Sequence, residues 1–411
     1  MWKILQVNKF NCLKGGADRY FLELSKLLQQ HGHSVAKLAM RHPDNQPSPW
    51  QKYFVSQVNY SDRSWNGRLK SLGRLFYSLE VRRQCRRLLS DFRPQLAHIH
   101  NIYHQLSPSF LPLLKQAGVP AVMHLHDYKL LSPDYRLFSQ GQIDESACGG
   151  HYYRCVLNKS VKNSYAFSLA AALSMYWQHN LLNLYEPNVD LYIAPSRFVR
   201  DLFVRYGYAA AKIRVVPHYV DAKVYQPNFN LGDYWLYFGR LDETKGVDIL
   251  IKAYAALGPS DKRLVIAGAG AEHKKLRDLI KTLGLDGRVD LIGPKYGETL
   301  KKIVANSLAV VVPSRCYEVF GLVNLEAAAL GKLVIAADIG GISEALKDHH
   351  TGLLFKPNNV DDLSAKLAWC LDNQQSARAM AQEARVTVER DFNPDGHYQS
   401  ISALYRELIK I

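Results

Sequence analysis

The sequence predicts an α/β protein built from two doubly wound domains, each around a parallel β-sheet. Short apolar runs typical of buried strands alternate with longer amphipathic segments typical of helices along the whole chain. The chain has 411 residues, 47% of them hydrophobic, which is enough for two cores. A polar segment with Pro, Asn and Gly, residues 221–233, separates the two halves.

In the N-terminal half, the first strand is expected at residues 3–7. Gly15 and Gly16 follow it, and a helix from about residue 18 to residue 31 ends before Gly32. Residues 132–164 are rich in Tyr, Gly and Cys, and we expect an irregular insertion there. The other apolar runs predict strands at residues 95–100, 121–124, 191–194 and 213–216.

The C-terminal half repeats the same alternation of strands and helices. Its first strand is expected at residues 234–239, directly after the polar separator. Further strands are expected at residues 264–267, 289–292, 309–312 and 334–336.

Positive charge is concentrated in the N-terminal half. Residues 1–230 contain 29 Lys and Arg against 14 Asp and Glu, whereas residues 231–411 contain 23 of each, so the whole formal net charge of +15 lies in the first part. A field of one sign on one domain predicts an anionic partner, such as a membrane surface, a nucleic acid or a polyanionic glycan.

The stretch 63–93 carries nine of these basic residues. Apolar residues recur there at helical spacing and predict an amphipathic helix that can lie on an anionic leaflet. A core-packed helix with a solvated basic face is the alternative. Aromatic residues are sparse in the stretch, so nucleic acid is disfavoured. The apolar residues are Leu69, Leu72, Leu75, Phe76 and Leu79.

Membrane-spanning segments and disulfides are not expected. The longest apolar stretch that looks helical, residues 167–177, is shorter than the roughly 20 residues a span needs. The first residues lead straight into a strand, which argues against a signal peptide. The six cysteines are scattered, as expected in a reducing cytoplasm.

Glu318 and Glu326 point most directly to a function. They follow an apolar run in the order of a buried strand, a loop with Glu318 and Gly321, and a helix carrying Glu326. A helix N-terminus has unpaired N–H groups and a positive dipole end, so it can hold a phosphate. At 1.5 Å rise per residue, the carboxylates lie roughly 10 Å apart. A nucleotide sugar, with hydroxyls at both ends and a diphosphate between them, fits this spacing.

Arg240 and Lys245 flank the loop after the first strand of the second half. A leaving diphosphate gains negative charge in the transition state, and fixed cations stabilise that charge. An ordinary solvated loop is the alternative. The chain contains no Asp-x-Asp pair, which a metal-held diphosphate would need. We therefore expect neither a metal nor another cofactor.

His126 follows the strand at 121–124, at the edge of a parallel sheet where ligands bind. It can bond a donor hydroxyl or stabilise charge, and a structural histidine is the alternative. Gly15 and Gly16 let the backbone approach a ligand closely, although many first turns use glycine. Tyr296 can stack on a base or can be a surface turn residue.

Four segments in order resemble glycosyltransferase family 4, a family of retaining enzymes with the GT-B fold. They are GGADRYFLELSKLLQQHGHSV, YFGRLDETKGVDILIKAY, EVFGLVNLE and GGISEALKDHHTGLLFKP. The family signature is Glu-x7-Glu in a strand–loop–helix setting, which Glu318 and Glu326 match. The resemblance covers nearly all of the chain.

The resemblance implies the GT-B arrangement of two Rossmann-like domains facing each other across a cleft. Residues 1–225 would form the acceptor-side domain, to which the last helix, 395–411, returns, and residues 226–394 would bind the nucleotide sugar. With the residue arguments above, it gives a catalytic set of Glu318, His126, Arg240 and Lys245. The substrate-binding set is Gly15, Gly16, Phe320, Gly321, Leu322, Glu326 and Tyr296.

Two features depart from the family pattern. His218 and Tyr219 stand where Asn-Gly is common, so the acceptor side of that turn is expected to differ. The insertion resembles a subgroup with a cysteine cluster, but only Cys148 and Cys155 remain, too few for a four-ligand zinc site. We therefore expect no metal there.

These observations predict a metal-independent hexosyltransferase that uses a UDP- or GDP-sugar. Its acceptor would be lipid-linked or an oligosaccharide, as in bacterial lipopolysaccharide and capsule synthesis. It would be cytoplasmic, peripheral on the inner face of the plasma membrane, with an anionic membrane surface and no nucleic acid as partner. The alternatives are another GT-B enzyme, such as a sugar-nucleotide epimerase or a phosphorylase, and a non-catalytic nucleotide- or glycan-binding protein.

Overall fold

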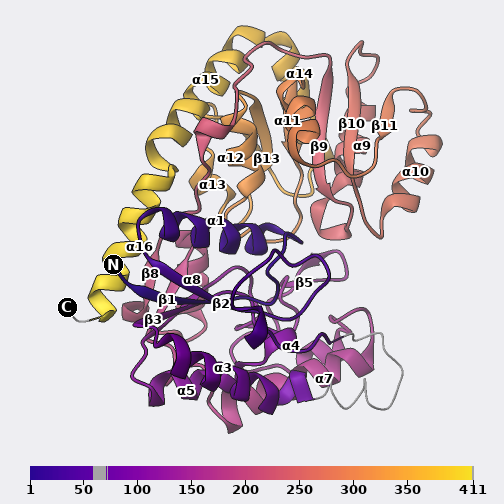
Figure 1. The fold of residues 1–411 in the computed structure, drawn as a ribbon. Helices are drawn as coiled ribbons and strands as arrows, with labels where there is room; N and C mark the ends of the chain where they lie inside the picture. Colours follow the sequence, from indigo (N-terminus) through magenta and orange to yellow (C-terminus); the bar gives the residue numbers. More distant parts are fainter. Residues whose placement is uncertain (59–70, 72, 410–411) are drawn as a thin grey trace. The chain divides into compact units, whose positions relative to one another are not determined.

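The computed structural model describes residues 1–58, 71 and 73–409, and the chain divides into two compact units (Figure 1). The N-terminal unit comprises residues 1–139, 144–216 and 398–411, and the C-terminal unit comprises residues 140–143 and 217–397. Each is an α/β unit around one six-stranded sheet, and all neighbouring strands in both sheets are parallel. The predicted fold class is thus confirmed for each unit.

The sheet of the N-terminal unit has the strand order β2-β1-β3-β4-β7-β8. Its strands are β1 (Lys3–Val7), β2 (Ser34–Leu38), β3 (Leu96–Ile99), β4 (Ala121–His124), β7 (Leu191–Ala194) and β8 (Ile213–Val215). In Figure 1, α1 (Gly16–Gln30) lies on one face of this sheet, and α3 (Leu79–Phe92) and α5 (Leu111–Gln116) lie on the other. Helices on both faces explain why the strands are continuous apolar runs.

Smaller elements complete this unit. The expected irregular insertion contains the two-stranded sheet of β5 (Phe138–Ser139) and β6 (Gln142–Ile143), of which β6 is counted with the C-terminal unit, and the short α6 (Arg154–Leu157). It is followed by α7 (Tyr165–Met175), which continues as a π-helical turn, Tyr176–Leu181. The remaining short helices are α4 (Tyr103–Leu106), α8 (Arg197–Arg205) and the 3₁₀ turns Gln51–Tyr53, Pro108–Phe110 and Ala210–Lys212.

The sheet of the C-terminal unit has the strand order β11-β10-β9-β12-β13-β14. Its strands are β9 (Tyr234–Arg240), β10 (Arg263–Ala269), β11 (Val289–Leu291), β12 (Ala309–Val312), β13 (Leu333–Ala337) and β14 (Leu353–Phe355). Its helices are α9 (Val247–Ala256), α10 (His273–Thr282), α11 (Gly297–Ala305), α12 (Leu322–Ala329), α13 (Ile342–Ala345), α14 (Val360–Asp372) and α15 (Gln374–Asp391), with 3₁₀ turns at Ala222–Val224 and Glu243–Lys245. One continuous apolar core joins sheet and helices.

The last helix, α16, spans Pro394–Ile409. Its residues from Tyr398 onward belong to the N-terminal unit. Tyr405 lies within hydrogen-bond distance of His98 Nδ1, at 2.6 Å, and the Tyr398 hydroxyl lies 2.8 Å from His33 Nε2. These contacts attach residues 398–409 to β3 and to the residue before β2.

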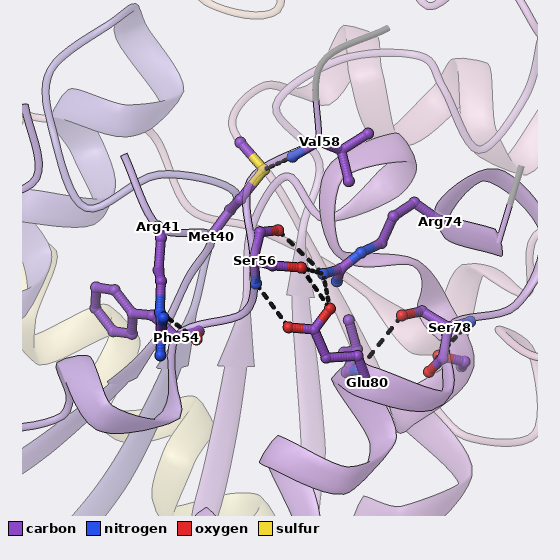
Figure 2. Close-up of polar contacts among 10 residues, drawn as sticks. Met40, Arg41, Phe54, Ser56, Val58, Arg74, Ser78 and Glu80 are labelled. Atoms are coloured by element: carbon purple, nitrogen blue, oxygen red, sulfur yellow. Dashed lines mark hydrogen bonds and ion pairs between the residues drawn. The ribbon is translucent and has the colours of Figure 1, made fainter. Parts of the chain in front are cut away.

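The described part of the basic stretch packs into the N-terminal unit (Figure 2). The buried Arg74 pairs with Glu80 at 2.6 Å and donates to the Ser56 carbonyl at 3.1 Å, and Glu80 accepts from the Ser56 N–H at 2.7 Å. Of the residues expected on a leaflet-facing stripe, Leu75 is buried, Phe76 is half-buried and Leu79 is 75% exposed. Leu69 and Leu72 lie outside the described residues.

Helix α3 buries its apolar side in the unit. Val81, Cys85 and Leu88 are fully buried, whereas Arg83 and Arg86 are exposed. This part of the stretch therefore has the alternative arrangement, a core-packed helix with a solvated basic face. Within the described residues, no helix has the length and apolar character that crossing a membrane requires.

Candidate functional site

Two loops meet at the carboxyl edge of the C-terminal sheet. One follows β9 and the other follows β12, and these strands are parallel neighbours. The Arg315 N–H donates to the Thr244 carbonyl across the two loops at 2.8 Å. Gly246 has φ 63°, and a Cβ there would lie 2.0 Å from the Pro313 carbonyl oxygen. The loops therefore approach so closely that only glycine fits at position 246.

A charged cluster holds the two loops together. Lys245 Nζ lies 2.5 Å from Glu318 Oε1, and the Ser314 hydroxyl donates to the same oxygen at 2.7 Å. Burial would raise the pKa of Glu318, but the ammonium group of Lys245, with Ser314 and Arg240, outweighs burial and lowers it. Burial would lower the pKa of Lys245, but Glu318 raises it well above its ordinary value. Both groups are therefore ionised at neutral pH.

Arg240 ends β9 and points its charge outward. Its guanidinium is 63% exposed and pairs with Asp242 Oδ2 at 3.1 Å. The Tyr237 hydroxyl donates to the Arg240 carbonyl at 2.6 Å and fixes the end of the strand. Asp242 also accepts from the Thr244 N–H at 3.1 Å, which caps the turn that carries Lys245. The cation is therefore fixed at its base and accessible at its tip.

The backbone of Glu318 is held by the loop after β13. Glu318 forms an isolated parallel bridge with Gly340, and the Gly341 N–H donates to its carbonyl at 2.7 Å. A Cβ on Gly340 would lie 2.4 Å from the backbone carbonyl oxygen of Glu318. This contact, with φ 67° at Gly340, explains the glycine at position 340, the first residue of the segment GGISEALKDHHTGLLFKP.

Helix α12 begins directly after this loop, with Gly321 as its N-cap at φ 86°. Leu322 is its first residue, and Glu326 lies in its second turn, half-buried. Asn324 is buried, and among the described residues its side-chain amide has no hydrogen-bond partner. Phe320 is 1% exposed and packs against the His218 and Phe392 rings, so its side chain belongs to the core.

Tyr296 is the N-cap residue of α11 and is 74% exposed. It follows β11, the edge strand of the sheet, so it lies away from the Lys245 cluster in strand order. Its exposure fits both a base-stacking residue and a surface turn residue. Its role stays a prediction.

In the N-terminal unit, His126 lies in a chain of buried polar groups. His126 Nε2 is 2.9 Å from His100 Nδ1, and His100 Nε2 is 2.6 Å from Gln6 Oε1. Because the Gln6 carbonyl oxygen accepts, His100 carries its proton on Nε2 and accepts through Nδ1 from the Nε2–H of His126. In this arrangement Nε2 of His126 is the donor.

The strands place these rings beside one another. His98 and His100 end β3 and stack at 4.5 Å between ring centroids, and His124 and His126 end the adjacent β4 and stack at 4.3 Å. Tyr20 of α1 packs on His124 at 4.4 Å. The side chains of alternate residues at a strand end point the same way, which is why all four rings gather on one side.

Gly15 is the N-cap of α1, with φ −171°, and a Cβ there would meet no described atom within 4 Å. Neither sterics nor backbone conformation therefore requires glycine at position 15, and Gly16 starts the helix. The buried Asp18 accepts from Asn8 Nδ2 at 2.9 Å. Burial raises the pKa of Asp18, despite Lys9 and Asn8.

Both departures from the family pattern lie in buried surroundings. Burial, with His397 nearby, lowers the pKa of His218 to about 3, so this ring is neutral. Tyr219 packs on His397 at 4.4 Å. Cys148 and Cys155 are free and buried, and burial raises their pKa to about 12 and about 11.

The structure joins some predicted residues and adds others. Lys245 and Glu318 are in direct contact, although 73 residues separate them. Sequence reasoning missed Ser314 and Asn324, which are small polar residues with no motif of their own. It also missed the pairing of His100 with Gln6, although a His-x-His pattern at two strand ends was a visible signal.

Family models match both halves of the chain. A model described as Glycosyltransferase Family 4 matches residues 14–224, and one described as Glycosyl transferases group 1 matches residues 227–387. The first alone covers more than half of the sequence. The chain belongs to glycosyltransferase family 4. The Lys245–Ser314–Glu318 cluster lies in the part matched by the group 1 model.

Solved structures similar to this family 4 chain have the GT-B fold. Sucrose-phosphate synthase from Thermosynechococcus elongatus has a TM-score of 0.75 at 22% identity, with both chains fully covered. HepE from Anabaena, in complex with UDP and glucose, has a TM-score of 0.70 at 20% identity, covering 99% of this chain and 100% of that one. The likeness establishes the fold.

Similarity in sequence is regional. D-inositol 3-phosphate glycosyltransferase from Nocardiopsis dassonvillei is 34% identical over 190 residues, 41% of this chain and 44% of that protein. The chain spans between a third and a half of the length of the curated relatives it matches.

Proposed function

We propose that this chain is a retaining glycosyltransferase that moves a hexosyl group from a UDP- or GDP-sugar to a lipid-linked or oligosaccharide acceptor. The observation that supports this proposal most strongly is the Lys245–Ser314–Glu318 cluster, which lies where the loops after β9 and β12 are in contact. It combines an ionised carboxylate, a fixed cation and a neighbouring helix N-terminus. HepE, whose structure contains UDP and glucose, is a relative in fold.

In this proposal the C-terminal unit holds the donor. Arg240, Lys245 and the N–H groups at the start of α12 face the diphosphate, with Gly321 and Leu322 shaping that N-terminus. Glu318 accepts hydrogen bonds from sugar hydroxyls, and Glu326 accepts from the ribose hydroxyls. Because Lys245 is already paired with Glu318, it needs little reorganisation when charge develops on the leaving group.

The chemical step breaks the bond from the anomeric carbon to the diphosphate oxygen and forms a bond to the acceptor oxygen on the same face. The acceptor proton passes to the departing phosphate oxygen, so no protein nucleophile is needed. Asp127, which accepts from the Lys129 N–H at 2.9 Å, is not assigned as one. His126, held by His100, would contact a sugar hydroxyl.

The acceptor and the cellular setting follow from the N-terminal half. Its excess of Lys and Arg favours an acceptor presented at an anionic surface. We propose a lipid-linked or oligosaccharide acceptor of bacterial lipopolysaccharide or capsule synthesis, and a peripheral location on the inner face of the plasma membrane. Gly15 and Gly16 would lie along the substrate, and Tyr296 would stack on the base.

A thermal-shift screen of the full chain against UDP, GDP and their sugars tests the donor part first. Stabilisation by one nucleotide family is expected, followed by transfer to an acceptor extract with retention of anomeric configuration, measured by NMR. Conversion of the donor with no acceptor present would indicate an epimerase instead. An unchanged donor with every acceptor tried would indicate a binding protein.

A further inference from the structure

Helix α7 and the turn after it expose a row of large apolar side chains. The exposed fractions of these side chains lie between 39% and 67%. Four of them recur every fourth residue, so they lie along one side of the helix. We call the set the α7 apolar face: Phe167, Leu169, Leu173, Trp177 and Leu181.

The opposite side of α7 is what attaches it to the fold. Ala172 and Met175 are buried in a small core with Tyr152 and Cys155 of the insertion. Gln178 Nε2 also donates to the Leu75 carbonyl at 2.6 Å. Within the α7 apolar face, Trp177 packs edge-on against Phe76 at 6.3 Å between ring centroids, whereas Leu169, Leu173 and Leu181 remain exposed. Contiguous exposed apolar surface of this kind marks an interaction site.

A cavity of about 220 Å³ opens beside this face. Phe167, Ala170 and Ala171 of α7 form one wall, and Leu75 and His104 contribute to another. The lining is mostly apolar, so the cavity suits a hydrocarbon chain. His104 belongs to α4, which begins three residues after His100, so the cavity lies near the carboxyl edge of β3.

The segment that contains α7 carries only positive charges of its own, although Asp144 accepts from Asn158 Nδ2 at 3.0 Å and Glu186 follows the segment. Residues 151–185 contain Arg154, Lys159 and Lys162 and no Asp or Glu. Lys159 Nζ lies 4.5 Å from the Tyr165 ring centroid, and Lys162 Nζ lies 4.6 Å from that of Phe167. Ammonium groups over aromatic rings beside an apolar row are typical of a membrane interface, where the stems lie in the apolar layer and the charges meet phosphates.

The cavity itself has a positive environment. Burial holds the pKa of His104 well below its ordinary value, and the positive charges of Lys129, Lys162 and Lys9 lower it further.

We propose that the α7 apolar face docks onto an anionic lipid leaflet, and that the hydrocarbon chain of one leaflet lipid enters the cavity beside α7. The inference deepens the proposed function, on which it rests, because a lipid-linked acceptor would be met at this leaflet. It replaces α3 by α7 as the docking element: α3 turns its apolar side inward, whereas α7 turns an apolar side outward.

A second copy of the chain fits this face less well than a leaflet does. Two such faces in contact would gain no charge complementarity from this segment, because residues 151–185 carry Arg154, Lys159 and Lys162 and no Asp or Glu. A phosphate-rich surface has the complementary charge.

Flotation with vesicles tests the proposal on the full chain. The wild type should bind vesicles of phosphatidylcholine with phosphatidylglycerol and bind pure phosphatidylcholine far more weakly. Leu169→Glu with Leu173→Glu should lower binding to the anionic vesicles about tenfold or more, because two apolar contacts become two repelled charges. The matched control, Leu283→Glu with Val386→Glu, changes exposed apolar residues of the C-terminal unit and should bind as wild type.

Two further variants sharpen the result. Vesicles should shift tryptophan emission to shorter wavelength, and Trp177→Phe should lose most of this shift while it still binds. Ala170→Trp fills the cavity and should weaken binding about threefold to tenfold. If Ala170→Trp binds vesicles as the wild type does and has an unchanged melting temperature, the proposal that a lipid hydrocarbon chain enters the cavity is wrong.

Equal vesicle binding by the Leu169→Glu, Leu173→Glu variant, or no preference of the wild type for anionic vesicles, would overturn the proposal. So would a wild-type dimer that this variant converts to monomer without any vesicle binding. UDP and GDP binding, measured on the same samples, separates the two proposals. A chain that binds a nucleotide but no vesicles keeps the donor assignment and loses the docking surface.

Discussion

The carboxyl edges of the two sheets differ in chemistry although they share a topology. In each sheet the strand order reverses at one point, between β1 and β3 in the N-terminal unit and between β9 and β12 in the C-terminal unit. Both candidate sites lie at these reversals, where ligands bind in open parallel sheets. The C-terminal reversal carries the ionised pair of Lys245 and Glu318, and the N-terminal reversal carries Gln6 and His100, with His126 after the neighbouring strand β4.

The difference teaches how one fold can supply two kinds of binding surface. A diphosphate needs fixed charges, and a charge can be fixed near a core only beside an opposite charge. Sugar hydroxyls need acceptors and donors in set directions, which a chain of neutral hydrogen-bonded rings provides. This difference is the reason we propose that the C-terminal unit binds the diphosphate and that His126 contacts sugar hydroxyls.

The largest effect is expected from Lys245→Met, which removes the cation and leaves Glu318 without it. Donor affinity should fall about a hundredfold, and the free energy of unfolding should fall by about 3 kcal/mol because a carboxylate in a partly buried site loses its partner. Calorimetry with UDP or GDP and urea unfolding measure the two effects. Lys252→Met, which removes an exposed lysine from α9, is the control, and an equal loss there would contradict the charged-pair role.

The two glutamates should separate kinetically. Glu318→Ala should lower kcat about a hundredfold, because it removes a sugar contact and the partner of Lys245, whereas Glu326→Ala should mainly raise the donor KM. Steady-state kinetics with varied donor measures both. Glu298→Ala, at an exposed position on α11, is the control. Unchanged kinetics in both test variants would refute the donor assignment.

Gln6→Leu tests the neutral chain in the N-terminal unit. Without the Gln6 acceptor, His100 can adopt the other tautomer and donate from Nδ1 to Nε2 of His126. The donor and acceptor roles of the two His126 nitrogens are then exchanged. We expect kcat to fall about tenfold and its pH profile to shift, with UDP affinity unchanged. If kcat falls with an unaltered pH profile and the melting temperature falls too, Gln6 has only a structural role.

The carboxyl groups of the two units should respond to pH with opposite sign. The folded pKa of Glu318 is below its ordinary 4.5, so its stabilisation is complete above pH 4.5 and is lost as pH falls through the lower folded value. The folded pKa of Asp18 is raised, so ionisation of Asp18 opposes folding at neutral pH. We expect urea unfolding to show that the free energy of unfolding of Asp18→Asn, measured relative to the wild type, is higher at pH 7 than at acid pH. For Glu318→Gln, the same difference from the wild type should be lower at pH 7 than at acid pH. The same sign for both would break the comparison.

The smallest effect is expected from metal removal. If fixed cations and a helix N-terminus hold the diphosphate, transfer should continue in EDTA at an unchanged rate. Activity that disappears in EDTA and returns with manganese would contradict the cation assignment.

Much of the fold followed from the sequence because the central strands are buried on both faces. β1, β4, β7 and β12 coincide with continuous apolar runs, and their bounds were predicted to the residue. β2 and β14 were not predicted, because a five-residue run with two half-buried positions and a three-residue run carry little signal. Short edge strands are defined by their neighbours more than by their own residues.

The site was predictable only in part. The order of strand, loop and helix indicated that Glu318 and Lys245 lie at strand ends, but their direct contact depends on β9 pairing with β12, which local sequence does not specify. The role of the basic stretch depended on which way its apolar residues point. Arg74 and Leu75 turned inward through contacts with Ser56 and the core, and no periodicity could reveal that.

A crystal structure of the full chain with UDP or GDP tests the central claim most directly. The diphosphate should lie against Lys245 and Arg240 at the N-terminus of α12, with the ribose hydroxyls beside Glu326. A nucleotide bound elsewhere, or an empty site at saturating nucleotide, would contradict the assignment of the donor to this cluster.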